Sequence, residues 1–153
     1  MPSIFNDSPY ISPQPQVYYI SAPPPQTHRP TPPPQIYHSK TFQNIDDSKI
    51  DLLCSAIKDY QRGTHLVLRR SIFSDESWGK FLDTVAQSNK ITRLSLNCMG
   101  LDDTHTTLLE NFIKKSFFLK KLTLAGNHFH FTHSCLREAA RNRHPPLKVN
   151  LLG

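Results

Sequence analysis

The residues of this chain that are best suited to chemistry are gathered in one segment, HFHFTHSC. It places His128, His130, His133 and Cys135 close together, and both residue types bind zinc. A tetrahedral zinc site needs about four ligands that converge on one point, and the spacing H-x-H-x-x-H-x-C is not that of a zinc finger. We therefore predict a polar loop at this segment, without a metal or any other cofactor.

Nucleophilic catalysis by a thiol is the second chemistry to consider. Cys98 or Cys135 would need a neighbouring histidine as base, and no local sequence signature pairs either cysteine with one. The glycines are scattered, so no phosphate-binding loop is predicted. We expect a protein that is not an enzyme and has no small-molecule substrate, and a thiol enzyme remains the third of the functions considered.

The cysteines and the apolar runs bear on the compartment. Three cysteines, spread far apart, predict free thiols in a reducing compartment, the cytoplasm, rather than a disulfide framework. No run of about 18 apolar residues is present, and the N-terminus MPSIFNDSPY has neither the cationic nor the apolar region of a secretory signal. We expect no membrane partner, and delivery into a host cell by a route that needs no such signal stays open.

Positive charge is the third property with chemical consequences. Residues 62–153 carry fourteen lysines and arginines against seven acids, a net charge of +7. Residues 1–61 carry four against five, a net charge of −1. A basic balance of this kind favours an acidic protein surface or a nucleic acid as the partner of the second part.

The prolines divide the chain into two parts. Eleven of the thirteen prolines lie between Pro2 and Pro34, where two proline triplets, at residues 23–25 and 32–34, favour an extended polyproline II conformation. We predict a disordered proline-rich segment over residues 1–44 and a folded domain over residues 45–153. A solvated tail and a ligand for an SH3, WW or EVH1 domain are both open interpretations of the proline-rich segment.

A repeated leucine pattern organises the folded domain. The pattern L-x-x-L-x-L-x-x-N/C-x-L fits three segments that follow one another at a constant spacing along the chain. Its five marked positions are occupied by Leu119, Leu122, Leu124, Asn127 and Phe129, by Ile91, Leu94, Leu96, Met99 and Leu101, and by Gly63, Leu66, Leu68, Ser71 and Phe73. In each segment the leucines alternate with other residues, which predicts a short strand with one buried face.

The chain therefore resembles the ribonuclease-inhibitor-like subtype of leucine-rich repeat proteins. The resemblance covers about residues 63–153 and implies a short α/β solenoid, in which each repeat contributes a strand to a concave parallel sheet and a helix to the convex side. We expect a capping helix at 46–61, repeats at 63–90, 91–118 and 119–146, and a terminal strand at 147–152. That last strand would present an edge that a dimer mate could cover.

One position departs from the family pattern. Position 9 normally carries an Asn or Cys whose side chain turns inward and satisfies backbone groups of the bend. Asn127 complies, Ser71 is expected to substitute in part, and Met99 cannot. We expect the turn at Asn127 to be the best defined of the three and the turn at Met99 to be distorted.

Because the leucines account for the fold, function is expected in the residues between them. His65, Arg93 and Lys121 occupy position 3 of the three strands, and neighbouring strands lie about 4.8 Å apart, which predicts a basic column on the exposed face of the sheet. Lys148 is expected beside Lys120, in the column of position 2. The predicted partner-binding residues are His65, Val67, Arg69, Arg70, Arg93, Ser95, Asn97, Lys120, Lys121, Thr123 and Lys148.

These features favour a non-catalytic protein-interaction module that binds an acidic partner protein. The resemblance implies an enzyme as partner and an inhibitor or adaptor role, because ribonuclease-inhibitor-like repeats often bind enzymes and occlude active sites. The composition also resembles the small leucine-rich repeat effectors that Legionella-type intracellular bacteria inject into host cells. Binding of RNA by the basic face is the main alternative, and a solvated face without a partner also stays open.

Overall fold

The computed structural model describes residues 38–61 and 64–152, which form an α/β domain with a five-stranded parallel sheet and four α-helices. The strands are β2 (His38–Gln43), β3 (Thr64–Arg69), β4 (Ile91–Asn97), β5 (Lys121–Thr123) and β6 (Lys148–Asn150). The helices are α1 (Ile50–Lys58), α2 (Asp75–Gln87), α3 (Thr106–Lys115) and α4 (His133–Asn142), with 3-10 turns η2 (Asp47–Lys49) and η3 (Asp103–His105). The predicted α/β class is confirmed, and the disorder predicted for residues 1–37 lies outside the described residues.

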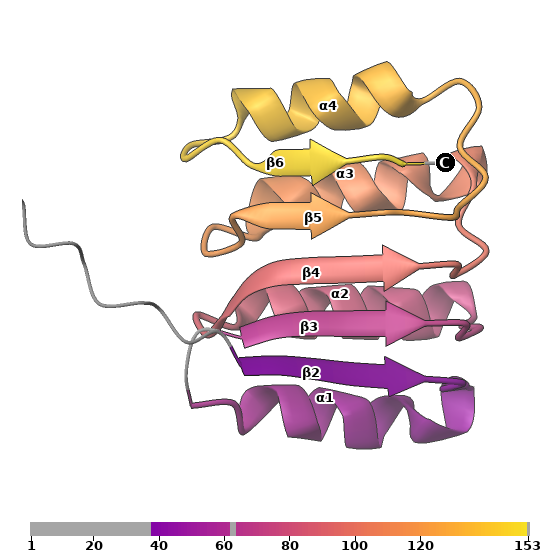
Figure 1. The fold of residues 1–153 in the computed structure, drawn as a ribbon, viewed down its shortest axis with the longest axis vertical. Coiled ribbons are helices and arrows are strands. Elements are labelled where there is room, and N and C mark those ends of the chain that lie inside the picture. Colours follow the sequence, from indigo (N-terminus) through magenta and orange to yellow (C-terminus); the bar gives the residue numbers. More distant parts are fainter. Residues whose placement is uncertain (1–37, 62–63, 153) are drawn as a thin grey trace, which may run out of the picture. The chain divides into compact units, whose positions relative to one another are not determined.

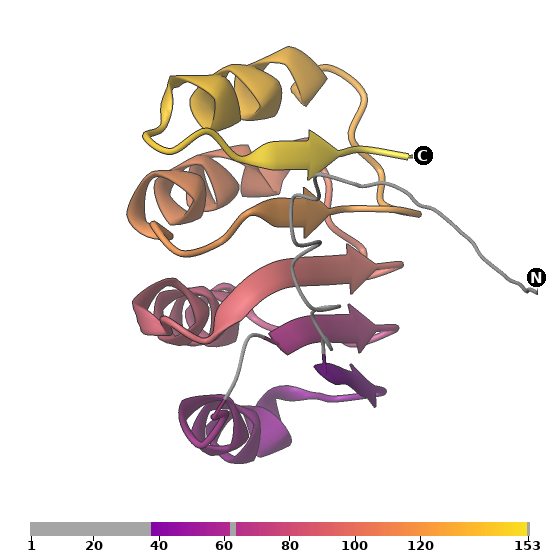
Figure 2. The ribbon, with the colours of Figure 1, turned by 60° about the vertical axis from the view of Figure 1, so that its left-hand side comes forward.

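The strands follow one another across the sheet in chain order, β2-β3-β4-β5-β6, and every pair is parallel. Figure 1 shows the five arrows side by side and pointing the same way, and Figure 2 shows the helices together on one side of the sheet. Each helix packs against the next, α1 on α2, α2 on α3 and α3 on α4. The helices cover one face of the sheet, and we call the opposite face of β2–β6 the strand face.

The core lies between the sheet and the helices. Leu66, Leu94 and Leu122 occupy equivalent places on three neighbouring strands, and each is completely buried. Trp78 of α2 packs edge-on against Phe81 of the same helix, with ring centroids 6.0 Å apart. Burying side chains of this size contributes about 1.5–3 kcal/mol each. The packing of strand leucines against helix side chains therefore provides the main stabilisation of the domain.

Strand β2 corrects the predicted boundary of the folded domain. The proline-rich composition predicts disorder up to residue 44, but residues 38–43 pair with β3 along their whole length. Most side chains of β2 are exposed, and Phe42 alone within the strand packs partly against the core. Because β2 is held mainly by backbone hydrogen bonds to β3, its hydrophobic pattern carried too weak a signal to predict it.

Three of the four helical segments begin at a side-chain cap, whereas α4 begins at Thr132 without one. The side chains of Asp46, Ser74 and Asp102 accept hydrogen bonds from the backbone N–H groups of Ser48, Ser77 and Thr104, at 3.0, 3.3 and 3.0 Å. A side-chain acceptor at this position satisfies one of the backbone donors that a helix leaves unpaired at its start. Asp46 is therefore the cap of the first helical segment.

Two of the aspartates that directly follow these caps accept hydrogen bonds from the next segment along the chain. Asp47 accepts a hydrogen bond from the backbone N–H of Ser74 at 2.9 Å. Asp103 accepts one from the hydroxyl of Thr132 at 2.8 Å and one from the N–H of His130 at 3.1 Å. Hydrogen bonds from the Thr132 hydroxyl and the neighbouring backbone lower the pKa of Asp103, so its charged form stabilises the loop before α4.

Asn127 satisfies the backbone of the turn that follows β4. Its Oδ1 accepts hydrogen bonds from the N–H groups of Met99 and Leu101 at 2.9 and 3.1 Å, and its Nδ2 donates to the carbonyl of Leu96 at 2.7 Å. Ser71 has part of the same role two strands earlier, because its hydroxyl accepts from Ile45 N–H and donates to the carbonyl of Arg69. Both side chains are buried, so these turns are held from inside.

Replacing Asn127 by alanine is expected to lower the free energy of unfolding by about 2–4 kcal/mol, because the buried N–H groups of Met99 and Leu101 lose their acceptor. Chemical denaturation followed by circular dichroism measures the change. Asn97→Ala is the matched control, because the buried Oδ1 of Asn97 accepts no hydrogen bond from the described residues. The control is expected to cost less than about 1 kcal/mol. Equal losses in the two variants would contradict this role of Asn127.

Candidate protein-binding face

The parallel register brings four basic side chains into one row across the strand face. His65 lies opposite Arg93, Arg93 opposite Lys121, and Lys121 opposite Lys148. With neighbouring strands about 4.8 Å apart, the row extends over roughly 14 Å. His65, Arg93 and Lys121 are half-buried, and Lys148 is exposed. We call these four residues the basic row.

The place of Lys148 corrects one predicted pairing. A constant repeat spacing predicts Lys148 beside Lys120, but Lys148 lies opposite Lys121, so the last step along the chain is shorter than the others. This register places Val149 opposite Leu122, and both pack in the core. A shift by one position would turn Asn150 inward in place of Val149, so the apolar pattern of β6 selects the shorter spacing.

The middle of the strand face is less accessible than predicted. Val67 and Ser95 lie opposite one another on β3 and β4, but each is only 7% exposed. The Nε2 atom of His65 lies 2.8 Å from the hydroxyl oxygen of Ser95, so the imidazole hydrogen-bonds to a serine that the sequence predicts to be open to a partner. Thr123, which lies opposite Ser95 on β5, is half-buried. Val67, Ser95 and Thr123 therefore form a poorly accessible strip beside the basic row.

Arg69, Arg70 and Asn97 lie apart from the basic row, where β3 and β4 end. Arg69 is opposite Asn97, four residues beyond His65, which corresponds to about 13 Å along the strand. Together with Arg70 they line a hollow of about 240 Å³. The Oδ1 atom of Asn97 is buried there and accepts no hydrogen bond from the described residues. The predicted site is thus divided into a basic row and a separate pair of arginines.

The backbone is strained in the turns at the ends of β3 and β4. Arg70 and Cys98 have φ values of 47° and 54°, in the left-handed region that residues other than glycine rarely adopt. Gly126 stands at the equivalent place after β5, with φ 71°, and a Cβ there would lie 2.8 Å from the Cys98 Sγ. The turn after each of these strands therefore requires a positive φ, and glycine meets that requirement at the third.

Lys120 does not belong to the strand face as the structure presents it. It precedes β5, its side chain is exposed, and its backbone N–H donates to the carbonyl of Thr92 at 2.7 Å. Lys121, the next residue, takes the place in the basic row. Lys120 thus lies in the turn that leads into the sheet, and we assign it to that turn.

The position of His65 in the basic row affects the pKa of its imidazole. Partial burial lowers the pKa of His65 from its ordinary value of 6.5, and the positive charges of Arg93 and Lys121 lower it further. The imidazole is therefore mostly neutral at pH 7, and the positive charge of the row resides on the arginine and the lysines. An anion bound to the basic row would offset the charges of Arg93 and Lys121 and would therefore raise the pKa of His65.

The histidine-rich segment and the cysteines are arranged as separate groups. His128 and His130 are exposed, and the ring of His133 packs at 6.4 Å from that of Phe129. Over residues 38–61 and 64–152, no cluster of three or more His, Cys, Asp or Glu side chains is arranged to hold a metal ion. Cys54 is buried, whereas Cys98 and Cys135 are exposed thiols.

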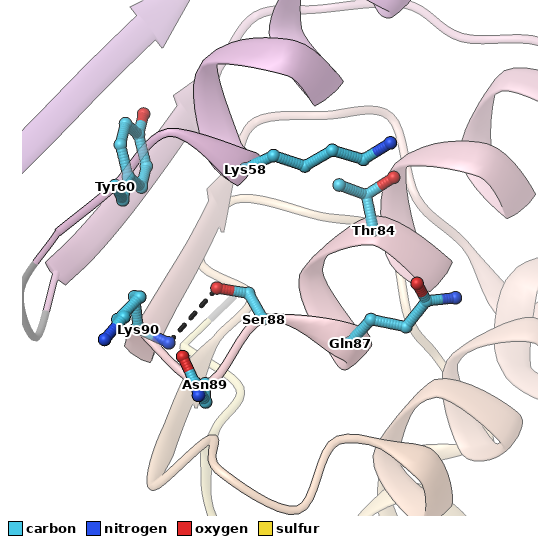
Figure 3. Close-up of a pocket in the computed structure, with 7 residues that line it drawn as sticks. All are labelled: Lys58, Tyr60, Thr84, Gln87, Ser88, Asn89 and Lys90. Carbon is cyan, nitrogen blue, oxygen red and sulfur yellow. Dashed lines mark hydrogen bonds between the residues drawn. The ribbon is translucent and has the colours of Figure 1, made fainter.

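A further hollow of about 330 Å³ lies at the C-terminal ends of α1 and α2 (Figure 3). Its lining is mostly polar and includes Lys58, Thr84 and Gln87. The hydrogen bond drawn in Figure 3 joins the backbone N–H of Lys90 to the Ser88 hydroxyl at 3.2 Å. None of the predicted partner-binding residues lines this hollow, so it does not extend the basic row.

Comparison of the chain with protein-family models, with curated proteins and with solved structures finds no match. The geometry and charge of the strand face are therefore the basis for proposing a function.

The double substitution Arg93→Gln with Lys121→Gln is expected to raise the pKa of His65, because it removes two positive charges that oppose the imidazolium. NMR titration of the His65 ring measures this shift, and Lys49→Gln with Arg137→Gln, which lie in helical segments, should leave it unchanged. A pKa that does not rise in the first variant would contradict the assignment.

The same depressed pKa predicts how stability depends on pH. Because the folded state holds the His65 proton less tightly than the unfolded state, the unfolded chain binds more protons just below pH 6.5. His65 is therefore expected to cause a loss of stability as the pH falls below about 6.5. Thermal melts of the wild type and His65→Gln across this range measure the contribution. A pH dependence that is the same in both would contradict it.

Proposed function

We propose that residues 38–152 are a short leucine-rich repeat solenoid of the ribonuclease-inhibitor-like type and act as a non-catalytic module that binds an acidic partner protein on the strand face. The solenoid is supported by the sequential parallel strands, by side-chain caps that recur at one spacing in three of the four helical segments, and by the inward asparagine at position 9. The binding function is supported mainly by the basic row.

The basic row favours a partner with several carboxylates. Four side chains of one sign, aligned at strand spacing, create a field that attracts an acidic surface before contact and raises the rate of association. Neutral His65 would gain a proton when carboxylates approach, because they offset the charges of Arg93 and Lys121. Binding by this face would therefore take up protons and strengthen as the pH falls toward 6.

The distance of Arg69 and Arg70 from the basic row constrains where a partner must carry its acidic groups. Arg69 and Arg70 lie about 13 Å along the strands from the basic row. The buried residues Val67 and Ser95 lie between these two arginines and the basic row. A partner that uses both groups must present acidic side chains at two places with a small, flat contact between them. A folded protein surface meets this requirement, and the solenoid would then act as an inhibitor or adaptor of that protein, including as an effector delivered into a host cell.

RNA is the alternative partner for a basic face. Binding of single-stranded RNA commonly uses aromatic side chains on which bases stack. At the outward positions of β2–β6 in the described structure the side chains are polar, basic or small, and none is Phe, Tyr or Trp. This composition favours a protein partner over RNA.

The charge reversal Arg93→Glu with Lys121→Glu is expected to reduce capture of the partner at least tenfold and to leave the melting temperature nearly unchanged, because both side chains lie on the strand face and outside the core. Affinity capture with the full chain as bait, quantified by mass spectrometry at physiological salt, measures the loss. Treatment with ribonuclease distinguishes the alternatives, because only an RNA-mediated capture would disappear.

Lys49→Glu with Arg137→Glu is the matched control, since it changes the net charge by the same amount at exposed positions of the helical segments. This control should keep the captured partner. Retention of the partner by the Arg93 and Lys121 reversal, or equal loss in the control, would contradict the proposed site.

A further inference from the structure

Two phenylalanines stand exposed in the turn between α3 and β5, which we call the aromatic turn (residues 116–119). Phe117 is 61% exposed and Phe118 is 52% exposed. The surrounding sequence is KKSFFLKK, so a pair of lysines precedes the turn and another pair follows it. Lys114, Lys115 and Lys120 are exposed as well. Large apolar side chains between lysines therefore project from one short segment.

The fold itself does not require these aromatics. The equivalent turn between α2 and β4 reads Ser88, Asn89, Lys90 and Ile91, in place of Ser, Phe, Phe and Leu. Ser88 and Ser116 are both C-caps of the preceding helix, and Ile91 and Leu119 are both buried. Asn89 and Lys90, which Figure 3 shows, are exposed polar residues at the two places that Phe117 and Phe118 occupy. The chain thus builds the same connection elsewhere without apolar side chains.

A buried arginine holds the aromatic turn in place. Arg143 is 5% exposed, and its guanidinium donates hydrogen bonds to the backbone carbonyls of Ser116 and Leu119, the residues that bracket the two phenylalanines. Its Nε also donates to the carbonyl of Pro145 at 2.8 Å. The burial of a charged guanidinium would otherwise be unfavourable, and these hydrogen bonds to carbonyl oxygens compensate for it. The aromatic turn is consequently anchored on both sides while its side chains remain outside.

The edge of the domain that carries the aromatic turn is basic. Figure 1 shows this turn at the end of the sheet where the strands begin, together with the α2–β4 and α4–β6 connections. The C-terminal end of α3 favours cations, which accounts for Lys114 and Lys115, and Lys115 also lies 3.5 Å from Asp83. Lys120 lies beyond the helix, so the helix dipole does not account for it. The capping aspartates lie at the other ends of the helices, where they do not offset this charge.

A hollow of about 410 Å³ adjoins the aromatic turn. Phe117 and Lys114 line one side, and Asn142 and His144 line part of the other. It therefore combines an apolar ring, a cation and polar groups beside the projecting phenylalanines. A phosphate-bearing headgroup would meet Lys114 there while an adjacent acyl chain met the ring.

We propose that the aromatic turn is a contact site for the surface of an anionic lipid bilayer. Exposed aromatic side chains insert at the level of the headgroups, and clustered lysines attract the acidic lipids around them, with each lysine near the surface contributing to binding. None of the helices in the described structure is long and apolar enough to span a bilayer, so the contact is peripheral. The proposal does not depend on the function assigned to the strand face.

This inference revises the expectation of no membrane partner. That expectation came from the absence of a long apolar run, which bears on segments that span a bilayer and not on a short turn at its surface. Phe117 and Phe118 adjoin Leu119, which is buried, so the sequence alone did not show that their rings lie outside. The charge of the flanking lysines favours an anionic bilayer over an apolar protein pocket, and a protein partner becomes one outcome of the test.

Flotation of the full chain with vesicles tests the proposal. Binding is expected to phosphatidylcholine vesicles that contain about 30% phosphatidylserine, to weaken at high salt, and to be at least tenfold weaker with phosphatidylcholine alone. Phe117→Asn with Phe118→Lys copies the α2–β4 turn and adds a positive charge. It should reduce binding at least tenfold because the apolar insertion is lost, whereas attraction by charge alone would become stronger.

Lys114→Gln with Lys115→Gln is the second variant, and it leaves the strand face unaltered. It should weaken vesicle binding about 10- to 30-fold through the loss of two lysines near the surface. Circular dichroism establishes that each variant is folded. Failure of the folded wild type to float with the anionic vesicles, or undiminished binding of the Phe117 and Phe118 variant, would overturn the proposal. Capture of a protein that competes with the vesicles for the wild-type turn would also overturn it in favour of a protein site.

A fluorescent variant gives an independent measurement. Trp78 is the only tryptophan in the chain and is 2% exposed, so it should not respond to vesicles. Phe117→Trp places a second indole on the aromatic turn. A blue shift and quenching by brominated lipid are expected in this variant and not in the wild type. A second tryptophan whose emission is unchanged by anionic vesicles would contradict insertion of the turn.

Discussion

The common register of the parallel strands is the constraint on which the rest of the structure depends. Leu66, Leu94 and Leu122 stack in the core, and their burial determines which residues of β3, β4 and β5 point the other way. A slip of one position would bury Arg93 and expose the leucine beside it, which makes the register strongly specified. The basic row is therefore a consequence of core packing, although no residue of the row contributes to the core.

The acidic and basic side chains of the domain lie in different places. Asp47 and Asp103 stabilise the loops at the helix N-terminal ends, where the helix dipole favours them. The basic row lies on the strand face, where partial burial and, after it, the positive charges of Arg93 and Lys121 lower the pKa of His65. Like charges gathered in this way repel one another and attract an acidic surface, which agrees with the recognition role proposed for them.

The sequence predicted what depends on local periodicity and missed what depends on neighbours. Alternating leucines predicted the strands, and their spacing predicted the alignment of His65 with Arg93. The shortened step to Lys148 could not be foreseen, because it follows from burying Val149 against its neighbours. Strand β2 escaped prediction because backbone pairing holds it, and the burial of Ser95 depends on the imidazole beside it. The Ser74 and Asp102 caps were not predicted, although they follow Asp46 at the same spacing as the leucines and this spacing can be read in the sequence.

Chemical-shift mapping tests most directly whether the basic row receives acidic partners. The ¹⁵N-labelled full chain would be titrated with polyglutamate at physiological salt, and the amide and side-chain signals of the strand face would be followed. The largest shifts are expected at His65, Arg93, Lys121 and Lys148, with smaller shifts at Arg69. Shifts that centre on the helices, or that spread evenly over all exposed lysines and arginines, would contradict this expectation.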